Sequence, residues 1–459
     1  MSIVKKELAM AIINKTMTRR KFLLNGTTAI AALSVPSVVP SSVFGSNAPS
    51  SRIVIGCVGL GGMGMGNMRG FLNKKNAQIV AACDVVTSGR SEYGPNANGY
   101  GNKGKDLGRE PARREVNEYY AEKSRLGRFK GCAGYSDFRD LIARTDIDVV
   151  VVTTPDHWHV PISLAAVKAG KDVYCEKPLS LTISEGRVLA DAVKRYGRIL
   201  QTGTQHRSNS TRRYICELIR NGRIGKLHTV KCSIGGGPSC PPQPVMPVPN
   251  GFNYEMWLGQ APWAPYMEKR CHYYFRFIWD YAGGQVTNNG VHALDFIQWA
   301  LGTDRSGPVE IQGRGDFPVD GLFNTPTNWD IEYTYDDAIK LLFKSGKWGI
   351  RFEGSEGWIQ TSPFDASPKS LLKSVIGPDE IHLYKSNDHK QNFLDCIKSR
   401  KDPIAPVEVG HRSAAICHLG NIAMLTGRKL KWDPEREQFI NDTTANQMLF
   451  RPMRSPWRL

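Results

Sequence analysis

The chain has 459 residues, of which 41% are hydrophobic and 22% charged, a composition typical of soluble globular proteins and long enough for two domains. The formal net charge is +17, but residues 1–48 contribute five of these charges, and no basic run with interleaved aromatic residues follows them. This distribution argues against a nucleic-acid-binding protein. It indicates a generally basic protein and leaves acidic substrates as an open alternative.

The ten cysteines are scattered and include no Cys-x-x-Cys pair. Cys57, Cys83, Cys175 and Cys232 lie in apolar runs, where cysteine behaves as a small hydrophobic core residue. We therefore expect little dependence on disulfide bonds. No Cys and His residues have the spacing of zinc ligands, so no metal is expected.

The N-terminal segment resembles a twin-arginine signal peptide. Arg19 and Arg20 stand before a mildly apolar stretch that continues through Pro36 and Pro40. The prolines and the many Ser and Thr residues disfavour a stable membrane span, so none is expected. Residues 1–48 are predicted to be a signal peptide and linker that engage the twin-arginine export machinery and direct the protein to the periplasm. A disordered basic tail is the alternative.

An apolar strand predicted over residues 52–58 runs directly into a glycine-rich turn. Gly59, Gly61 and Gly64 have the GxGxxG spacing of a dinucleotide-binding loop. The first glycine permits the tight turn, the second lets a pyrophosphate approach the backbone, and the third allows the following helix to pack on the strand. The other residues of the predicted cofactor loop are Leu60, Gly62 and Met63.

A second apolar strand, residues 78–83, ends in Asp84, twenty residues after Gly64. An acid at this position accepts hydrogen bonds from both ribose hydroxyls of a dinucleotide. Its carboxylate would repel a 2′-phosphate, so the sequence predicts NAD rather than NADP as the cofactor. Arg90 lies close enough in the sequence to weaken that preference.

The alternation of strand and helix is interrupted by a polar, glycine-rich insertion over residues 87–133, which we expect to be an excursion on the surface. After it the apolar runs resume and complete a six-stranded unit with parallel strands. The elements predicted here are helices at 111–126, 137–143 and 160–169, strands at 148–154 and 172–175, and a last helix and strand within 184–202.

Polar residues follow two of these buried strands. Thr154, Pro155 and His159 come after the first, and Glu176 and Lys177 come after the second. Because ligands of open α/β sheets bind outside the carboxyl ends of the strands, these side chains are predicted to lie at the cofactor site.

The second half of the chain is predicted to form one sheet with flanking helices. Short runs of alternating apolar residues are typical of strands that are buried on one face. The predicted elements are strands at 227–234, 309–313, 329–335, 339–343 and 349–353, and helices at 291–301, 389–399 and 410–425, the last two packing back between the domains.

Four blocks of residues, in this order, resemble the family of glucose-fructose oxidoreductase, inositol dehydrogenase and rhizopine catabolism proteins (Gfo/Idh/MocA). The blocks are GlyLeuGlyGlyMetGly at 59–64, ThrProAspHisTrpHis at 154–159, GluLysPro at 176–178 and GlyValHisAlaLeuAsp at 290–295. The resemblance implies an α/β protein with a Rossmann NAD-binding domain, residues 49–205, and a C-terminal α/β domain, residues 206–459. The second domain would carry an open, mostly antiparallel sheet that covers the nicotinamide on one face and forms homo-oligomers through the other.

Lys177 is the first candidate catalytic residue. A lysine beside a proline at the end of a buried strand is partly desolvated, which lowers its pKa and equips it to exchange a proton with a hydroxyl group. The resemblance implies that Lys177 handles the proton of the reaction and that Glu176 contacts the cofactor.

His292, in the first turn of a predicted helix, is the second catalytic candidate, and Asp295 one turn later is expected to orient it. Asn288 stands where the family usually has Asp, which removes a carboxylate from the site. His292 and Lys177 would then carry proton transfer without it. The residues expected to contact the substrate are Gln205, Arg207, Asp280, Asn288, His292 and Asp295.

These features together predict an NAD-dependent oxidoreductase that acts on a secondary hydroxyl of a carbohydrate, glycoside or cyclic polyol. Because no pool of free NAD is expected outside the cytoplasm, the cofactor would be tightly held. One alternative is a glycoside hydrolase or lyase that oxidises its sugar transiently. The other is a non-catalytic, NAD-containing sugar-binding protein, which Asn288 mildly supports and the pair of Lys177 and His292 opposes.

Overall fold

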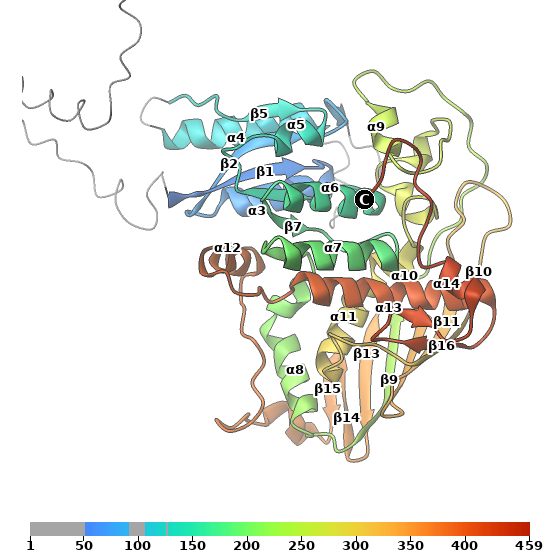
Figure 1. Ribbon diagram of the computed structural model, residues 1–459. Helices are drawn as coiled ribbons and strands as arrows, with labels where there is room; N and C mark the ends of the chain where they lie inside the picture. The colour runs from blue at the N-terminus through green and yellow to red at the C-terminus, as the bar shows by residue number, and fades with distance from the viewer. Residues whose placement is uncertain (1–50, 91–105, 125–126) are drawn as a thin grey trace, which may run out of the picture. The chain divides into compact units, whose positions relative to one another are not determined.

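The computed structural model describes residues 51–90, 106–124 and 127–459, and the chain from Arg52 to Leu459 forms one compact unit (Figure 1). The predicted signal peptide and most of the polar part of the insertion lie outside the described residues. Twin-arginine export therefore stays a prediction.

The first sheet confirms the predicted Rossmann topology. Its six strands run in the order β5-β2-β1-β6-β7-β8, and every pair of neighbours is parallel. The order reverses between β1 and β6, which is where ligands bind in this topology. The strands are β1 (Ile53–Val58), β2 (Ala77–Cys83), β5 (Ala133–Tyr135), β6 (Val149–Val152), β7 (Asp172–Cys175) and β8 (Leu200–Thr202).

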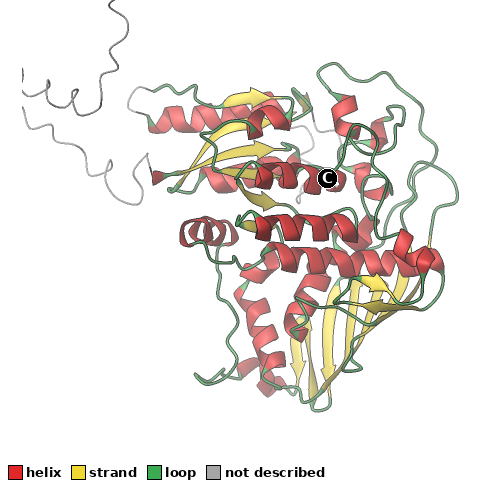
Figure 2. Cartoon of the chain, viewed as in Figure 1, coloured by secondary structure: helices red, strands yellow, loops and turns green. Residues whose placement is uncertain are grey.

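Helices pack against this sheet (Figure 2). They are α3 (Gly62–Leu72), α4 (Arg109–Lys123), α5 (Phe138–Ile142), α6 (Asp156–Lys168) and α7 (Ile183–Arg195). The expectation of a surface excursion is wrong for α4, because its Ala112 and Val116 are fully buried in the core beside Phe71. The polar face of α4 dominates its composition and hides this short apolar stripe. Two short strands, β3 (Gly89–Arg90) and β4 (Asp106–Leu107), pair with each other before it.

The second sheet has nine strands in the order β15-β14-β13-β9-β12-β11-β10-β16-β17. The pair β9 and β12 is parallel and the other neighbours are antiparallel, so the predicted mostly antiparallel sheet is confirmed. The strands are β9 (Leu227–Ile234), β10 (Glu310–Asp316), β11 (Asn328–Thr334), β12 (Lys340–Ser345), β13 (Gly349–Gly354), β14 (Gly357–Thr361), β15 (Phe364–Ser367), β16 (Leu430–Asp433) and β17 (Gln438–Phe439). The last four were not predicted, because they are short and carry little alternation.

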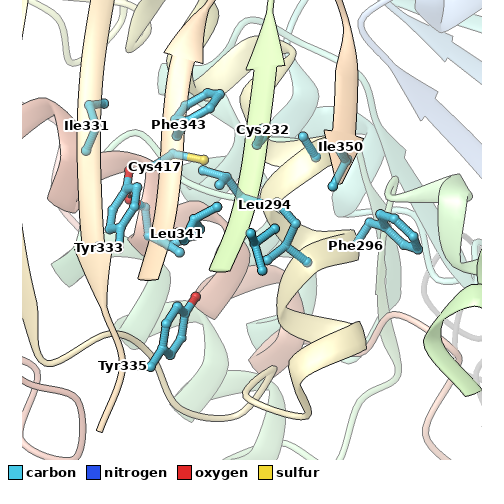
Figure 3. Close-up of a cluster of buried hydrophobic side chains, with 14 of the residues drawn as sticks. Cys232, Leu294, Phe296, Ile331, Tyr333, Tyr335, Leu341, Phe343, Ile350 and Cys417 are labelled. Atoms are coloured by element: carbon cyan, nitrogen blue, oxygen red, sulfur yellow. Dashed lines mark hydrogen bonds between the residues drawn. The ribbon is translucent and has the colours of Figure 1, made fainter. Parts of the chain in front are cut away.

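The inner face of this sheet packs against α11 (Gly290–Leu301) and α13 (Val407–Thr426). Figure 3 shows Leu294 and Phe296 of α11 beside Phe343 and Ile350 of the sheet. Truncating a buried leucine such as Leu294 to Ala would cost about 2–5 kcal/mol. Cys417 of α13 joins the same cluster, and all ten cysteines are buried and unbridged, as expected for core residues.

The outer face of the second sheet is polar. Ion pairs cross it between neighbouring strands, including Lys231 with Glu353 and Lys340 with Glu332. The homo-oligomer stays a prediction, and an interface on this face would be built on polar rather than apolar contacts.

Both late helices contact the Rossmann layer, as predicted for segments that pack back between the sheets. Phe393 and Leu394 of α12 (His389–Ser399) lie in the core around Phe71, and α13 packs between α7 and the second sheet. Among the described helices, none is both long and apolar enough to cross a bilayer. The division of the chain at residue 205 stays a prediction.

Candidate active site

All the residues predicted to contact the cofactor line one cavity of about 440 Å³ at the carboxyl edge of the first sheet. They are Gly59, Leu60, Gly61, Gly62, Met63, Gly64, Asp84, Thr154, Pro155, His159, Glu176 and Lys177. Of the predicted substrate contacts, Asn288 lines the same cavity. The predicted substrate contacts that are not among its lining residues are Gln205, Arg207, Asp280, His292 and Asp295.

The glycine turn between β1 and α3 has the geometry of a phosphate cradle. Gly59 has φ +84°, and a Cβ there would lie 2.6 Å from the backbone oxygen of Thr153, so only glycine fits without strain. A Cβ on Gly64 would lie 1.9 Å from the carbonyl oxygen of Gly59. A Cβ on Gly61 would meet no atom within 4 Å, which leaves open space next to the backbone. No side chain caps α3 at Gly61, so the N-terminal N–H groups of the helix are available to an anion.

Asp84 follows β2 and closes the other end of this turn. Its Oδ1 accepts from the Val86 amide at 2.8 Å and its Oδ2 accepts from the Leu60 amide at 2.5 Å. Burial raises the pKa of Asp84, and the two amide hydrogen bonds and the charge of Arg109 oppose that rise. The carboxylate is thus fixed against the glycine turn, where a ribose of a dinucleotide bound along the turn would reach it. The free N–H groups of α3, the open space beside the Gly61 backbone and the Asp84 carboxylate therefore fit a dinucleotide.

His159 of α6 ties together the loops that follow β6 and β7. It is 1% exposed, and its Nδ1 and Nε2 lie 2.6 Å from the Pro178 oxygen and 2.9 Å from the Thr154 oxygen. Burial lowers the pKa of His159 to about 4, so the ring is neutral at neutral pH. Its contacts show a structural role for the ring at the edge of the cavity.

Glu176 is buried at the same edge and is held by two amide side chains. Its Oε1 accepts from Asn67 Nδ2 at 3.0 Å and from Gln205 Nε2 at 3.1 Å. The Gln205 amide also donates to the Tyr174 hydroxyl at 3.3 Å, so this side chain orients Glu176, and its predicted contact with the substrate stays a prediction.

Lys177 lies at the end of β7 and is 7% exposed. Its Nζ donates to the backbone oxygen of Asn288 at 2.7 Å and to the Asn288 Oδ1 at 3.1 Å. Burial lowers the pKa of Lys177 to about 8, while the carboxylates of Glu176 and Asp156 raise it and the Arg276 charge lowers it further. Close to neutral pH this amine therefore exists in both protonation states.

Asp156 and Arg276 also line the cavity, and the sequence reasoning missed both as site residues. Asp156 is the first residue of α6 and is 5% exposed. Arg276, in the 3-10 helix η5 (Tyr274–Phe277), donates to Asn288 Oδ1 at 3.3 Å. An acidic residue within the ThrProAspHisTrpHis block could have been found from the sequence, whereas no local pattern marks Arg276.

His292 is buried and its ring lies 4.6 Å, centroid to centroid, from the ring of His206. Burial and the nearby charge of Lys177 lower the pKa of His292 well below its ordinary value. The expected pairing of His292 with Asp295 is wrong. The hydrogen-bond partners of the Asp295 carboxylate are other side chains.

One of these partners is Arg207, which was predicted to contact the substrate. Arg207 Nε donates to both carboxylate oxygens of Asp295 at 2.9 Å, and Ser413 Oγ donates to Oδ1 at 2.7 Å. The side chains of Arg207 and Asp295 are 2% and 0% exposed. Both predictions of substrate contact are therefore corrected: the two residues form a buried ion pair that joins η3 (Gln205–Ser208) to α11.

Asp280 does not reach the cofactor cavity either. Its neighbour Trp279 lines a separate cavity of about 260 Å³ together with Arg451. Arg451 also donates to the Trp279 backbone oxygen. Asp280 is not among the residues that line the cofactor cavity, and its contact with the substrate stays a prediction.

A covering segment, residues 246–276, lines the side of the cavity opposite the glycine turn. It is joined to the Rossmann layer by a β-bridge between Val86 and Phe252 and by the indole of Trp158, whose Nε1 donates to the Trp257 oxygen at 2.9 Å. Helix α9 (Tyr254–Leu258) lies within it. The cofactor cavity is therefore lined by residues that are far apart in the sequence.

A glycine cradle, a ribose-binding acid and a buried lysine at the switch point define a dinucleotide-binding α/β protein. Two family models match it: "Oxidoreductase family, NAD-binding Rossmann fold" at residues 113–204 and "Oxidoreductase family, C-terminal alpha/beta domain" at residues 239–459. The chain is also 33% identical over 307 residues to 1,5-anhydro-D-fructose reductase of Ensifer adhaerens, over 64% of this chain and 81% of that protein. It therefore belongs to the NAD-binding oxidoreductases of the Gfo/Idh/MocA family.

Other relatives match over a shorter stretch. Inositol 2-dehydrogenase of Salmonella typhimurium is 28% identical over 173 residues, which are 37% of this chain and 42% of that protein. The chain thus spans less than half the length of this relative. The crystal structure of the WlbA dehydrogenase from Bordetella pertussis in complex with NADH and UDP-GlcNAcA shares the fold, with a TM-score of 0.57, 16% identity and coverage of 83% of this chain and 99% of that one.

Proposed function

We propose that this protein is an NAD-dependent dehydrogenase that oxidises a secondary hydroxyl of a sugar or cyclic polyol to a ketone, or reverses that step. The observation that carries the proposal is Lys177, a buried amine that lines the same cavity as the glycine cradle. The relatives named inositol 2-dehydrogenase and 1,5-anhydro-D-fructose reductase support this class of substrate.

The cofactor and two residues of the site have different roles in the proposed reaction. When bound, NAD supplies the acceptor for the hydrogen and electron pair that leave the substrate carbon. The hydroxyl proton goes to the lone pair of Lys177 Nζ, which is available because burial lowers the pKa of this lysine to about 8. The oxygens of Asn288 that accept from Nζ fix the direction of the amine.

We assign proton transfer to Lys177 rather than to the predicted pair with His292. A buried imidazole with a pKa well below its ordinary value is a weak base, so it is a poor acceptor for the hydroxyl proton. The His292 ring packs at a tilt against the His206 ring, which supports a structural role.

We also propose that the protein is exported and retains its cofactor. Arg19 and Arg20 support export, and the covering segment, residues 246–276, supports retention because it adds contacts to a bound dinucleotide beyond those of the Rossmann layer. A retained cofactor must be returned to its starting state by a second substrate or within one catalytic cycle. Replacing Arg19 and Arg20 with Lys should leave the mature protein in the cytoplasm, and unchanged recovery from the periplasm would contradict export.

The reduced-nicotinamide absorbance of the purified protein tests the proposed function. Protein prepared without added nucleotide should carry close to one NAD or NADH per chain, and some members of a panel of sugars, glycosides and polyols should change the signal. Lys177→Met should lower the rate about 10²- to 10⁴-fold while NAD stays bound. The matched control is Lys168→Met, an exposed lysine on α6.

No response of the parent protein to any compound of the panel would overturn the proposed dehydrogenase. Near-parental activity of Lys177→Met would overturn the assignment of the proton to this lysine. A protein purified empty, which needs millimolar NAD in every assay, would contradict cofactor retention alone.

A further inference from the structure

Asp156 is a buried carboxylate that has no role in the proposed reaction as described so far. It begins α6, lines the cofactor cavity and is 5% exposed. Its Oδ2 has no hydrogen-bond partner among the described residues. A buried carboxylate oxygen without a partner is costly, so the site is built to give it either a proton or a ligand.

The charged groups that face Asp156 come from two other segments, the loop after β7 and η5. Burial raises the pKa of Asp156 to about 7, and the positive charges of Arg276 and Lys177 oppose the rise. On its own helix, His159 is neutral and adds no charge at neutral pH. Glu176, beside Lys177, raises the pKa of the lysine, as Asp156 does.

Asp156 and Lys177 line one cavity and carry opposite charges, and each shifts the pKa of the other, so the protonation of one depends on that of the other. Asn288, the residue that touches Nζ directly, cannot take up a proton, because an amide oxygen is not basic enough at neutral pH. Glu176 also lies near Lys177, but Asn67 and Gln205 already donate to its Oε1 and the Lys177 backbone amide donates to its Oε2. Among the described residues, Asp156 is thus the acid near the lysine that keeps a free carboxylate oxygen.

We propose that Asp156 accepts the proton that Lys177 receives from the substrate. The N–H bond of the ammonium breaks, its electron pair returns to Nζ, and a water in the cavity passes the proton to the free oxygen of the carboxylate, because that oxygen has no direct hydrogen bond to Nζ. The lysine is then neutral for the next turnover, and the carboxylic acid loses its proton to water when the site opens. This inference rests on the proposed function. Asp156 acts through Lys177 and is therefore a positioning residue.

The pH profile of sugar oxidation tests the inference. The rate rises with pH as Lys177 loses its proton, and the Asp156 carboxylate stabilises the ammonium form. Asp156→Asn should therefore move this rise about one unit toward lower pH, because a charge interaction of ~1.4 kcal/mol corresponds to one pKa unit. It should also lower kcat roughly 10- to 100-fold with little change in KM.

Two further variants distinguish a charge effect from loss of structure. Asp156→Glu should restore the parental profile. In an Asp156→Asn background, Asn288→Asp should restore it in part, because Asn288 Oδ1 already lies 3.1 Å from Nζ. Asp140→Asn, an exposed acid on α5, is the matched control and should leave the profile unchanged.

Infrared difference spectra between pH 6 and pH 9 report the carboxyl without any turnover. The parent protein should lose one protonated carboxyl near pH 7 that Asp156→Asn lacks. Lys177→Met should shift this carboxyl to higher pH, because removing the ammonium removes the charge that favours the ionised acid.

An unmoved pH profile in Asp156→Asn, with no such carboxyl in the spectra, would overturn the inference while the dehydrogenase activity stands. If the spectra show the carboxyl that depends on Lys177 but no sugar changes the nicotinamide signal, the proposed function is contradicted. The interaction between Asp156 and Lys177 is then still supported.

Discussion

Gly61→Ala should weaken the affinity for NAD while it leaves the stability of the nucleotide-free protein almost unchanged. The backbone at Gly61 has φ −70° and ψ −167°, values that alanine adopts without strain, and its added methyl group would meet no atom within 4 Å. The loss of glycine at the start of α3 costs about 0.5–1 kcal/mol, and the reduced freedom of the unfolded chain offsets about 0.4–1 kcal/mol. The stability of the nucleotide-free protein should therefore change little.

The same methyl group would stand where the backbone of the turn approaches the pyrophosphate. Inserting a methyl group into a closely packed contact costs about 1–3 kcal/mol, which corresponds to a roughly 5- to 150-fold weaker affinity for NAD. Gly64→Ala is the matched comparison. Its methyl group would lie 1.9 Å from the Gly59 carbonyl oxygen, so this variant should lose stability as well as affinity.

Calorimetric titration of nucleotide-free protein with NAD gives the affinity, and urea unfolding without nucleotide gives the stability. Parental affinity in Gly61→Ala would refute the placement of the pyrophosphate at this turn. A loss of stability as large as that of Gly64→Ala would refute the open space next to Gly61.

Three other substitutions test the remaining contacts. Trp457→Ala should speed NAD dissociation roughly 2- to 12-fold, measured by stopped-flow fluorescence, since a ring pair of this kind contributes about 0.5–1.5 kcal/mol. The Trp457 ring lies 4.8 Å from the ring of Trp158, and Trp158 holds the covering segment. Asp295→Asn should lower the free energy of unfolding by about 1.5–3 kcal/mol in urea, since Arg207 loses one of its two carboxylate partners and keeps Asp304, and should spare the activity of the folded fraction. Asp84→Ser should narrow the preference for NAD over NADP by about 1 kcal/mol in paired titrations.

Each of these has an outcome that would contradict it. An unchanged rate of dissociation in Trp457→Ala would mean that the C-terminal tail does not hold the covering segment. A substrate-specific rise in KM in Asp295→Asn, without loss of stability, would restore the predicted substrate contact. Equal titration curves for NAD and NADP in the parent protein would remove the role given to Asp84.

The sequence was sufficient to predict the cofactor half of the site. Gly59, Gly61 and Gly64 are set by local geometry, and Asp84 and Lys177 follow apolar strands whose carboxyl ends must share one edge of a parallel sheet. Strong alternation also predicted the central strands of the second sheet, whereas the short β14 to β17 carry too few residues for a pattern. These features depend on residues that are neighbours in the chain.

What only the tertiary structure decided is which distant side chains meet. Arg207 was predicted to face the substrate, yet the packing of η3 on α11 places Asp295 beside it. The meeting of Asp156, Lys177 and Arg276 likewise depends on three segments that the sequence separates by up to 120 residues. A local pattern fixes which edge of a strand or helix a residue occupies. The partner of a buried charge depends on how the elements pack, because burial removes water and leaves only the groups that packing brings into reach.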